Sequence, residues 1–223
     1  QNGKMSGECA DFTSFSFHAV KNFTTAEGGG LVWRHVPGVE DEEIYHNLML
    51  LTLHGQSKDA LAKTKLGAWE YDIKGLYYKC NMTDILAAVG LVQQKRYKGL
   101  LARRKEIIER YDEWIKDDDI MTLKHFDGGN ISSGHLYLTR VPNITGDQRN
   151  DIITKMAERG IATNVHFKPL PMHTAYKNLG FDIKDFPNSY EMYKNEITLP
   201  LHTCLTDEQT EYIIENFNRL RKI

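Results

Sequence analysis

The feature that most constrains this fold is an unbroken stretch of helix-forming sequence over residues 85–115. Thr83 and Asp84 precede it and can cap its first turn. Its first part is unusually apolar, which predicts a helix that is buried on several sides. From Leu100 to Ile115, charged and apolar residues recur at helical spacing. We therefore predict one long helix, with a domain boundary after it at Asp117-Asp118-Asp119.

Two short strands and one helix are expected before this stretch. Residues 11–17 alternate Phe with Thr and Ser, and Leu31-Val32-Trp33 forms a second short run, both typical of strands. Residues 40–53 carry acids in their first turn, where these complement the helix dipole, and apolar residues at helical spacing. That pattern predicts a helix that stops at Gly55.

Helices and strands alternate after the boundary. Thr206 and Gln209 form a capping box, which opens a last helix that runs to Arg221. Thr145 can cap another helix, which Gly160 ends. The remaining expectations are a helix over 146–159 and strands over 134–141 and 161–167. This order predicts a small α+β domain over residues 119–223 behind a first domain of residues 1–118.

The composition excludes several classes of protein. Apolar residues make up 41% and charged residues 26% of the 223 residues, and 28 basic against 30 acidic residues give a net charge of -2. No polybasic tract predicts a nucleic-acid partner, and no apolar run reaches the roughly 18 residues that cross a bilayer. The polar start lacks a signal-peptide pattern. The three widely spaced cysteines favour neither disulfides nor a metal site, so a cytoplasmic location is expected.

Lys21 follows the first predicted strand and is the chief candidate for chemistry. A lysine in a turn is ordinarily an exposed charge. Here a strand would hold it on a rigid edge, Ser16 lies five residues upstream, and Gly28-Gly29-Gly30 lets backbone approach a ligand closely. An amine that forms a Schiff base needs such a partly desolvated setting in order to be neutral near pH 7.

The run Ser16-Phe17-His18-Ala19-Val20-Lys21-Asn22-Phe23-Thr24-Thr25-Ala26-Glu27-Gly28-Gly29 resembles the lysine motif of the DegT/DnrJ/EryC1/StrS family of sugar aminotransferases. Later segments match the same family in the same order: His54-Gly55, Lys79-Cys80-Asn81-Met82-Thr83-Asp84-Ile85, Gly160-Ile161-Ala162-Thr163, His166-Phe167-Lys168-Pro169-Leu170 and Leu199-Pro200-Leu201-His202. The match covers nearly the whole chain. The first motif is the specific one.

The resemblance implies an α/β fold of the aspartate aminotransferase type (fold type I), of which this chain is the C-terminal part of the large domain plus a small α+β domain. It implies pyridoxal 5'-phosphate (PLP) as cofactor, with Lys21 forming the Schiff base and then acting as acid and base. Ser16 would bind the cofactor phosphate, and Lys79 or Asn81 would reach it from the neighbouring subunit of a homodimer. His135 and His166 would lie near a sugar nucleotide.

Simpler interpretations of these residues stay open. Asn81 at a helix start can be only a cap, and a strand histidine such as His166 is more often a hydrogen-bonded wall residue than a ligand. Cys80 stands where the family usually has Tyr or Phe, which puts that aromatic contact in doubt. The family carries its acid for the pyridine nitrogen upstream of the lysine motif, so the chain is expected to be a C-terminal part that is inactive alone.

The activity that the resemblance implies is transfer of an amino group from glutamate to a keto nucleotide-sugar, in the biosynthesis of amino sugars or polysaccharide. A dehydratase branch of the same fold has histidine in place of the lysine, and Lys21 speaks against it. A non-catalytic regulatory or binding member of the fold is the third possibility. Residues 57–77 and 125–133 are the expected specificity loops, since small differences in a pocket select the substrate.

Overall fold

The computed structural model describes residues 2–57, 69–115 and 120–222. It divides into two compact units, Gln1–Arg96 and Tyr97–Ile223. The division falls inside helix α2 (Asp84–Trp114), whose extent confirms the predicted long helix. The boundary predicted at residues 117–119 lies outside the described residues and stays a prediction. The larger part of the first expected specificity loop, residues 57–77, also lies outside the described residues.

The first unit is built on an antiparallel hairpin of β1 (Phe12–Ser16) and β2 (Gly29–Trp33), preceded by a short 3-10 helix, η1 (Ser6–Glu8). The register runs from Phe12 opposite Trp33 to Ser16 opposite Gly29. Both strands lie where the sequence predicts them. The hairpin therefore leaves residues 17–28, which contain Lys21, as the connection between its strands.

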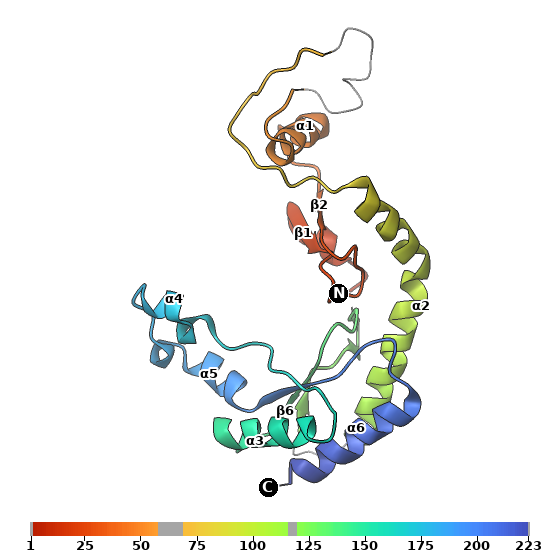
Figure 1. Cartoon of the computed structure of the whole chain (residues 1–223), viewed down its shortest axis with the longest axis vertical. Helices are drawn as coiled ribbons and strands as arrows, with labels where there is room; N and C mark the ends of the chain where they lie inside the picture. Colours follow the sequence, from red (N-terminus) through yellow and green to blue (C-terminus); the bar gives the residue numbers. More distant parts are fainter. Residues whose placement is uncertain (1, 58–68, 116–119, 223) are drawn as a thin grey trace. The chain divides into compact units, whose positions relative to one another are not determined.

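Helix α1 (Asp41–Thr52) follows the hairpin (Figure 1). It has three acids in its first turn. The helix ends at Thr52, within a residue of the predicted end at Leu53 and ahead of the predicted stop at Gly55. Gly55 itself has a φ of +72°, and a Cβ there would collide with the carbonyl group of Gly75. The chain then pairs with a later segment: Leu53 bridges Lys79, and the amide of His54 donates to the carbonyl oxygen of Tyr78 at 2.9 Å. This pairing fixes where Lys79 lies.

The first part of α2 is not buried on several sides, so that prediction is wrong. Ile85, Leu91 and Val92 are 78%, 63% and 54% exposed, whereas Gly90 is buried. Within the described residues of the first unit, α2 packs through the side that carries Gly90, against the loop of Lys21. An apolar run indicates that a helix has a surface suited to burial. It does not indicate which other segment packs on that surface.

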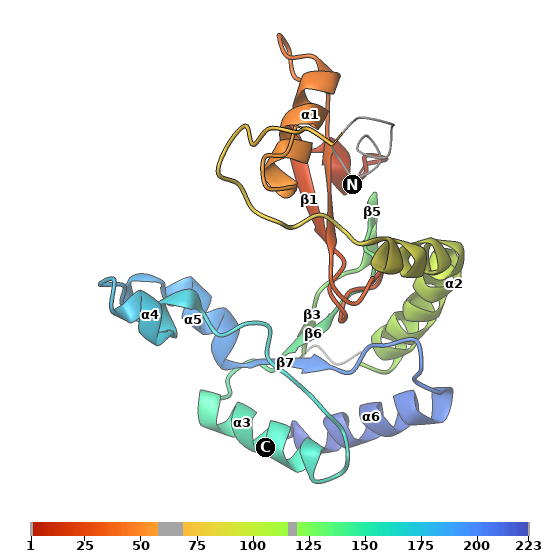
Figure 2. The same ribbon diagram turned by 45° about the horizontal axis from the view of Figure 1, so that its top comes forward.

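The second unit contains a three-stranded antiparallel sheet in the order β3 (Met121–Thr122), β6 (Tyr137–Arg140), β7 (Glu196–Leu199). Helices α3 (Gly146–Ala157) and α6 (Asp207–Leu220) lie side by side on one face of this sheet (Figure 2). The arrangement bears out the small α+β character expected for the second half. The sequence also predicted β6, α3 and α6, but not β7.

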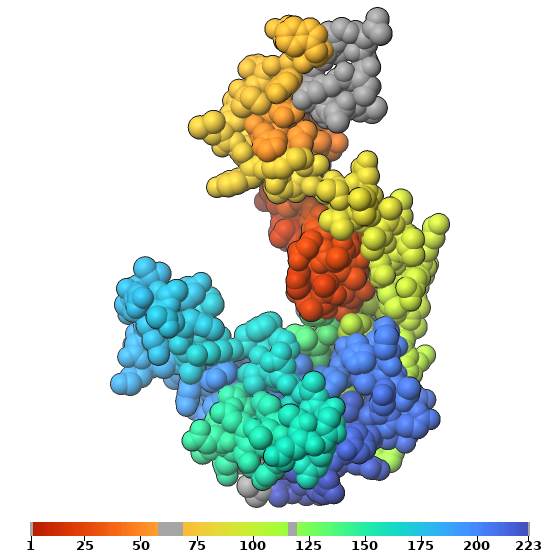
Figure 3. All heavy atoms as spheres, viewed as in Figure 1, coloured from red at the N-terminus to blue at the C-terminus, as the bar shows by residue number. Residues whose placement is uncertain are grey.

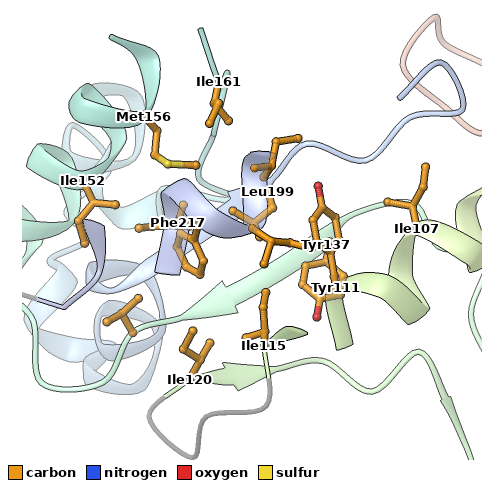
Figure 4. Close-up of a cluster of buried hydrophobic side chains, with 14 of the residues drawn as sticks. Ile107, Tyr111, Ile115, Ile120, Tyr137, Ile152, Met156, Ile161, Leu199 and Phe217 are labelled. Atoms are coloured by element: carbon orange, nitrogen blue, oxygen red, sulfur yellow. The ribbon is translucent and has the colours of Figure 1, made fainter. Parts of the chain in front are cut away.

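Apolar side chains from α2, the sheet, α3 and α6 form the core of the second unit (Figure 4). Tyr111, Tyr137 and Phe217 are fully buried, and the rings of Tyr111 and Tyr137 lie 4.7 Å apart. The tyrosine hydroxyls keep partners: Tyr111 donates to the carbonyl oxygen of Pro200 and Tyr137 to Asp112, both at 2.7 Å. Burying aromatic area while satisfying each hydroxyl stabilises this core.

The strand predicted over residues 161–167 is wrong. Only Asn164 pairs, through two backbone hydrogen bonds with Thr198 of 3.1 and 2.7 Å. Two residues later the amide of His166 donates to the side chain of Glu196 instead of to a strand. The segment is extended, but a side chain takes over the hydrogen bond that a ladder would supply.

A long excursion separates this segment from β7. It contains η3 (Leu170–Met172), α4 (Thr174–Lys177), η4 (Ile183–Asp185) and α5 (Pro187–Lys194). Figure 3 shows it standing out from the rest of the second unit. A separate small hairpin, β4 (Phe126–Asp127) with β5 (Asn130–Ile131), lies in the second expected specificity loop. Among the described residues, none of the helices is long and apolar enough to span a membrane.

Candidate functional site

Lys21 lies in a loop that is held closed by its own backbone. At its base the amide of Phe17 donates to the carbonyl oxygen of Gly28 at 2.9 Å, and the amide of Thr25 donates to that of Phe17 at 3.0 Å. The amide of Lys21 itself donates to the carbonyl oxygen of His18 at 2.9 Å, which makes a tight turn. Lys21 is half-buried. The loop therefore presents one amine from a fixed backbone.

Thr25 and Gly28 form the floor of this loop. Thr25 is only 1% exposed, and its hydroxyl donates to the carbonyl oxygen of Glu27 at 2.7 Å. Gly28 has a φ of +146°, and a Cβ built there would lie 2.7 Å from the hydroxyl oxygen of Thr25 and 2.9 Å from Cε of Met82. Only glycine fits this position without a shift of its neighbours.

The start of α2 packs against the same loop. A Cβ built on Gly90 would lie 3.1 Å from Cγ2 of Thr25, and Met82 contacts Gly28. The loop of Lys21 and the segment that carries Lys79 and Asn81 thus meet inside the first unit, although they are far apart in sequence. The ammonium group of Lys79 donates to the side-chain oxygen of Asn81, and both residues are exposed.

Ser16 is the last residue of β1 and lies opposite Gly29. It is exposed, and its hydroxyl oxygen accepts a 3.4 Å hydrogen bond from the amide of His18. An exposed hydroxyl therefore marks the base of the loop whose turn carries Lys21.

These groups fit a phosphorylated aldehyde such as PLP. The amine of Lys21 is the nucleophile that an aldehyde requires. The hydroxyl of Ser16, the ammonium of Lys79 and the amide of Asn81 are donors suited to a phosphate. The absence of a side chain at Gly28 keeps the backbone open to close approach.

In the second unit, His166 is tied to β7 through two contacts. Its amide donates to Oε2 of Glu196 at 2.8 Å, and its ring Nδ1 lies 2.8 Å from the hydroxyl oxygen of Thr198. His135 lies before β6 and is half-buried, and its carbonyl oxygen accepts a 3.3 Å hydrogen bond from Arg104. The structure thus shows a side-chain contact for His166, whereas the contact given for His135 is that of its backbone carbonyl oxygen.

His166 and Glu196 line a cavity of about 470 Å³ on the face of the sheet opposite α3 and α6. Arg140, Thr122 and Ser189 add polar groups to its wall. Its apolar lining consists of Met121, Leu123, Leu138, Phe167, Met192 and Tyr193. His135 does not contribute to this lining, so the two predicted histidines are not brought together in it.

Glu196 is a residue of this site that the sequence analysis missed. It is 5% exposed, and burial raises the pKa of its carboxyl group, whereas hydrogen bonds from Thr198 and from the amide of His166, and the charge of Arg149, act the other way. A signal existed: Glu196-Ile197-Thr198-Leu199 alternates polar and apolar residues between Asn195 and Pro200, as a short strand does.

The fold and the lysine loop are those of a known family: the model of the DegT/DnrJ/EryC1/StrS aminotransferase family matches residues 1–218. The chain belongs to this family. The resemblance inferred from the lysine motif is confirmed, as is the α/β fold of type I, and the family is PLP-dependent.

Two curated relatives illustrate the range of the family. The chain is 37% identical over 218 residues to the spore coat polysaccharide biosynthesis protein SpsC of Bacillus subtilis, covering 95% of this chain and 54% of that protein. It is 31% identical over 213 residues to the UDP-4-amino-4,6-dideoxy-N-acetyl-beta-L-altrosamine transaminase of Helicobacter pylori, covering 96% and 53%. The chain thus spans about half the length of the curated relatives that it matches.

Solved structures agree. Spr1654 of Streptococcus pneumoniae, assigned as a sugar aminotransferase, superposes in its PMP form with a TM-score of 0.94 at 56% identity, over 99% of this chain and 55% of that one. The PLP form of Spr1654 superposes with a TM-score of 0.92 at 53% identity. Helicobacter pylori PseC, an aminotransferase of pseudoaminic acid biosynthesis, superposes with a TM-score of 0.82 at 28% identity, over 100% of this chain and 56% of that one.

Proposed function

We propose that the protein containing this chain is a PLP-dependent aminotransferase that moves an amino group from glutamate to the keto carbon of a nucleotide-linked sugar. The observation that carries the proposal is the half-buried residue Lys21, held in a hydrogen-bonded loop whose sequence resembles the family's lysine motif. The names of the relatives SpsC and the altrosamine transaminase support amino-sugar or polysaccharide biosynthesis as the setting. The proposed location is the cytoplasm, as expected from the cysteine content of the sequence.

In this proposal, Lys21 has two tasks. Its Nζ atom would hold the cofactor covalently, and once free it would serve as the acid and base that takes a proton from the substrate carbon and returns it. When bound, PLP supplies an aldehyde for the amine and a ring that acts as an electron sink. The closed loop serves both tasks, because a fixed backbone keeps Nζ within reach of the same atoms throughout.

The other predicted residues would bind and orient. Ser16, at the base of the loop, is proposed to donate to the cofactor phosphate. Lys79 or Asn81 is proposed to reach that phosphate in the second active site of a homodimer, and the hydrogen bond between the two side chains keeps both close to one position. His135 and His166 are proposed to contact the sugar nucleotide.

Replacement of Lys21 by alanine in the full-length protein tests the proposal. The unaltered protein should show the visible absorbance of the lysine-bound cofactor and should carry the cofactor on Lys21 after borohydride reduction. Lys21→Ala should lose the absorbance, the labelling and glutamate-dependent amination of keto nucleotide-sugars. Retained activity in this variant would end the hypothesis.

A matched control is Lys155→Ala. Lys155 lies on α3 and pairs with Asp151 at 2.6 Å, with its side chain 46% exposed. Such a surface pair contributes at most about 1 kcal/mol, so this variant should keep the full absorbance and rate. A non-catalytic member of the fold would fail the activity assay with the unaltered protein, on any sugar nucleotide supplied.

A further inference from the structure

The hydroxyl of Thr24 connects the two ends of the loop that carries Lys21. It donates to the carbonyl oxygen of Phe17, at the start of the loop, at 3.0 Å. The hydroxyl oxygen of Thr24 also accepts from the amide of Ala26, near the end of the loop, at 2.9 Å. A hydroxyl has one proton to donate and lone pairs that accept, so both bonds form at once. One half-buried side chain thus joins Phe17 to Ala26.

Ala26 has a backbone conformation that alanine rarely adopts. Its φ is +68°, in the left-handed region, where a Cβ atom costs free energy and glycine does not. A residue keeps such a conformation only when the surrounding structure holds it there. A hydroxyl that binds the amide two residues later stabilises a turn, and the hydroxyl of Thr24 does this for Ala26. The bond therefore opposes relaxation of the loop at this residue.

The carbonyl oxygen of Phe17 accepts from two neighbouring residues. The amide of Thr25 donates to it at 3.0 Å, and the hydroxyl of Thr24 donates at 3.0 Å as well. Two donors at different points of the chain restrict rotation of this segment more than one donor does. Lys21 lies between these anchors, four residues after Phe17 and three before Thr24. The orientation of its backbone therefore depends on both bonds.

We propose that Thr24 is a positioning residue for Lys21. Its hydroxyl fixes the end of the loop against Phe17 and holds Ala26 in the left-handed conformation, and it thereby determines where Nζ of Lys21 can reach. This role rests on the proposed function, in which Lys21 holds the cofactor and moves a proton. Displacing a reacting atom by about 1 Å is enough to slow a reaction on the order of a hundredfold.

Thr24→Val in the full-length protein removes the hydroxyl and keeps the branched shape of the side chain. Its affinity for PLP, measured by absorbance titration, should fall roughly tenfold, the size of one hydrogen bond. Thr24→Ser keeps the hydroxyl and should keep the affinity of the unaltered protein. Unchanged affinity in Thr24→Val, or a Thr24→Ser loss as large as that of Thr24→Val, would overturn the proposal.

The role of Ala26 is tested by repeating the comparison in an Ala26→Gly background. Glycine adopts a positive φ without the cost that alanine has, so the loop needs the hydroxyl of Thr24 less. The loss of PLP affinity on Thr24→Val should therefore be at least about threefold smaller in this background. An equal loss in both backgrounds would show that Thr24 does not act through Ala26.

A matched control is Thr154→Val. Thr154 on α3 also donates its hydroxyl to a carbonyl oxygen, that of Asn150 at 2.9 Å, but it is exposed and lies in the second unit. This variant should keep the affinity for PLP of the unaltered protein. A loss equal to that of Thr24→Val would show that the loop is not specifically affected, and would overturn the proposal.

Hydrogen exchange resolved to single amides provides a readout without cofactor or turnover. In the apo protein, the amide of Ala26 should exchange roughly tenfold faster in Thr24→Val than in the unaltered protein, because it loses its acceptor. Thr24→Ser should restore the slow exchange. Equal exchange rates in all three proteins would show that Thr24 does not hold this amide, and would overturn the proposal.

Kinetics at saturating PLP separate positioning from a purely structural role. Thr24→Val should lower kcat at least roughly tenfold and change KM for the sugar nucleotide by about twofold or less, because a displaced amine impairs proton transfer rather than substrate binding. Thr24→Ser should restore kcat. An unchanged kcat in Thr24→Val would overturn the positioning role. If the unaltered protein binds PLP but aminates no keto nucleotide-sugar, the proposed function fails, and the affinity and exchange results still decide whether Thr24 fixes the loop.

Discussion

Gly28 and Thr25 pack so closely that a Cβ added at Gly28 would lie 2.7 Å from the hydroxyl oxygen of Thr25. That hydroxyl is already engaged with the carbonyl oxygen of Glu27, and Thr25 is 1% exposed, so it has little room to move. The contact closes the loop of Lys21 from below. The position of the amine therefore depends on a residue that carries no functional group.

Gly28→Ala should weaken PLP binding to the full-length protein. The substitution meets both the contact with Thr25 and a φ of +146°, which costs an ordinary residue about 1–3 kcal/mol. Relief requires the loop to shift, so we expect at least a roughly tenfold loss of cofactor affinity in an absorbance titration.

The control for this variant is Gly99→Ala. Gly99 lies in α2, and a Cβ there would meet nothing within 4 Å. Alanine should stabilise the helix by about 0.5–1 kcal/mol and leave cofactor affinity unchanged. Equal affinities of the two variants for PLP would show that Gly28 does not hold the loop.

His125 should make the second unit less stable in mild acid. It is 6% exposed, its Nδ1 lies 3.0 Å from the hydroxyl oxygen of Ser132, and its ring stacks on that of Tyr137. Burial lowers the pKa of His125, and the negative charge of Asp112 opposes this shift only partly. The unfolded chain therefore binds the proton more readily than the folded one.

The sign follows from that difference. The contribution of neutral, buried His125 to the free energy of unfolding is fully present above the unfolded-state pKa of about 6.5. It is lost as the pH falls towards the lower folded-state pKa, by at most about 1.4 kcal/mol per pH unit. Denaturant unfolding at several pH values, compared between the unaltered protein and His125→Phe, should show this extra loss only with the histidine. Parallel curves over that range would refute the assignment.

Arg104 should be more important for stability than its position on α2 suggests. It is 8% exposed, and one guanidinium nitrogen donates to the carbonyl oxygens of Gly134, His135 and Leu201 at 3.0, 3.3 and 3.1 Å. Arg104→Met would leave these acceptors without their donor, at a cost of about 2–4 kcal/mol. The free energy of unfolding in urea measures this.

The neighbouring Lys105 supplies the comparison for Arg104. Its side chain is 54% exposed and pairs with Glu109 at 3.6 Å. Lys105→Met should therefore change the free energy of unfolding by about 1 kcal/mol or less. If the two variants lose equal stability, the three carbonyl contacts of Arg104 contribute nothing particular.

Local signals made parts of this fold predictable. The capping residues Thr145 and Thr206 and the glycine at 160 act within a few residues of themselves, and the structure confirms the helices that they delimit. The alternation of Phe with Thr and Ser over residues 11–17 likewise predicted the strand before Lys21, and the lysine motif predicted the family. Such features depend on chain chemistry that the sequence displays directly.

Pairing between segments that are far apart in the sequence limited how much of the fold could be predicted. Residues 161–167 are as β-branched and apolar as a strand requires, yet only Asn164 finds a partner, because Glu196 takes the amide of His166. Glu196–Leu199 was missed as a strand because its alternation covers only four residues, although all four are buried. Whether an extended segment joins a sheet depends on residues far away in the sequence, which a local pattern does not reveal.

The capping box of α6 allows a final, quantitative prediction. The amide of Gln209 donates to the hydroxyl oxygen of Thr206 at 3.2 Å, and the amide of Thr206 donates to the side chain of Gln209 at 3.0 Å. Helix α6 contributes the fully buried Phe217 to the core, so fraying at its start loosens packing as well. Thr206→Ala should cost about 1 kcal/mol of unfolding free energy, within the range of about 0.5–2 for such caps.

Thr206→Ser keeps the hydroxyl and should lose little stability. The corresponding Thr145→Ala on α3 should also cost about 1 kcal/mol, since Thr145 and Gln148 form the same box. The two boxes share no residue, so the losses in the double variant should add to within about 0.5 kcal/mol. Urea unfolding of the four variants measures this, and a Thr206→Ser loss as large as that of Thr206→Ala would show that the methyl packing of Thr206, not its hydroxyl, starts the helix.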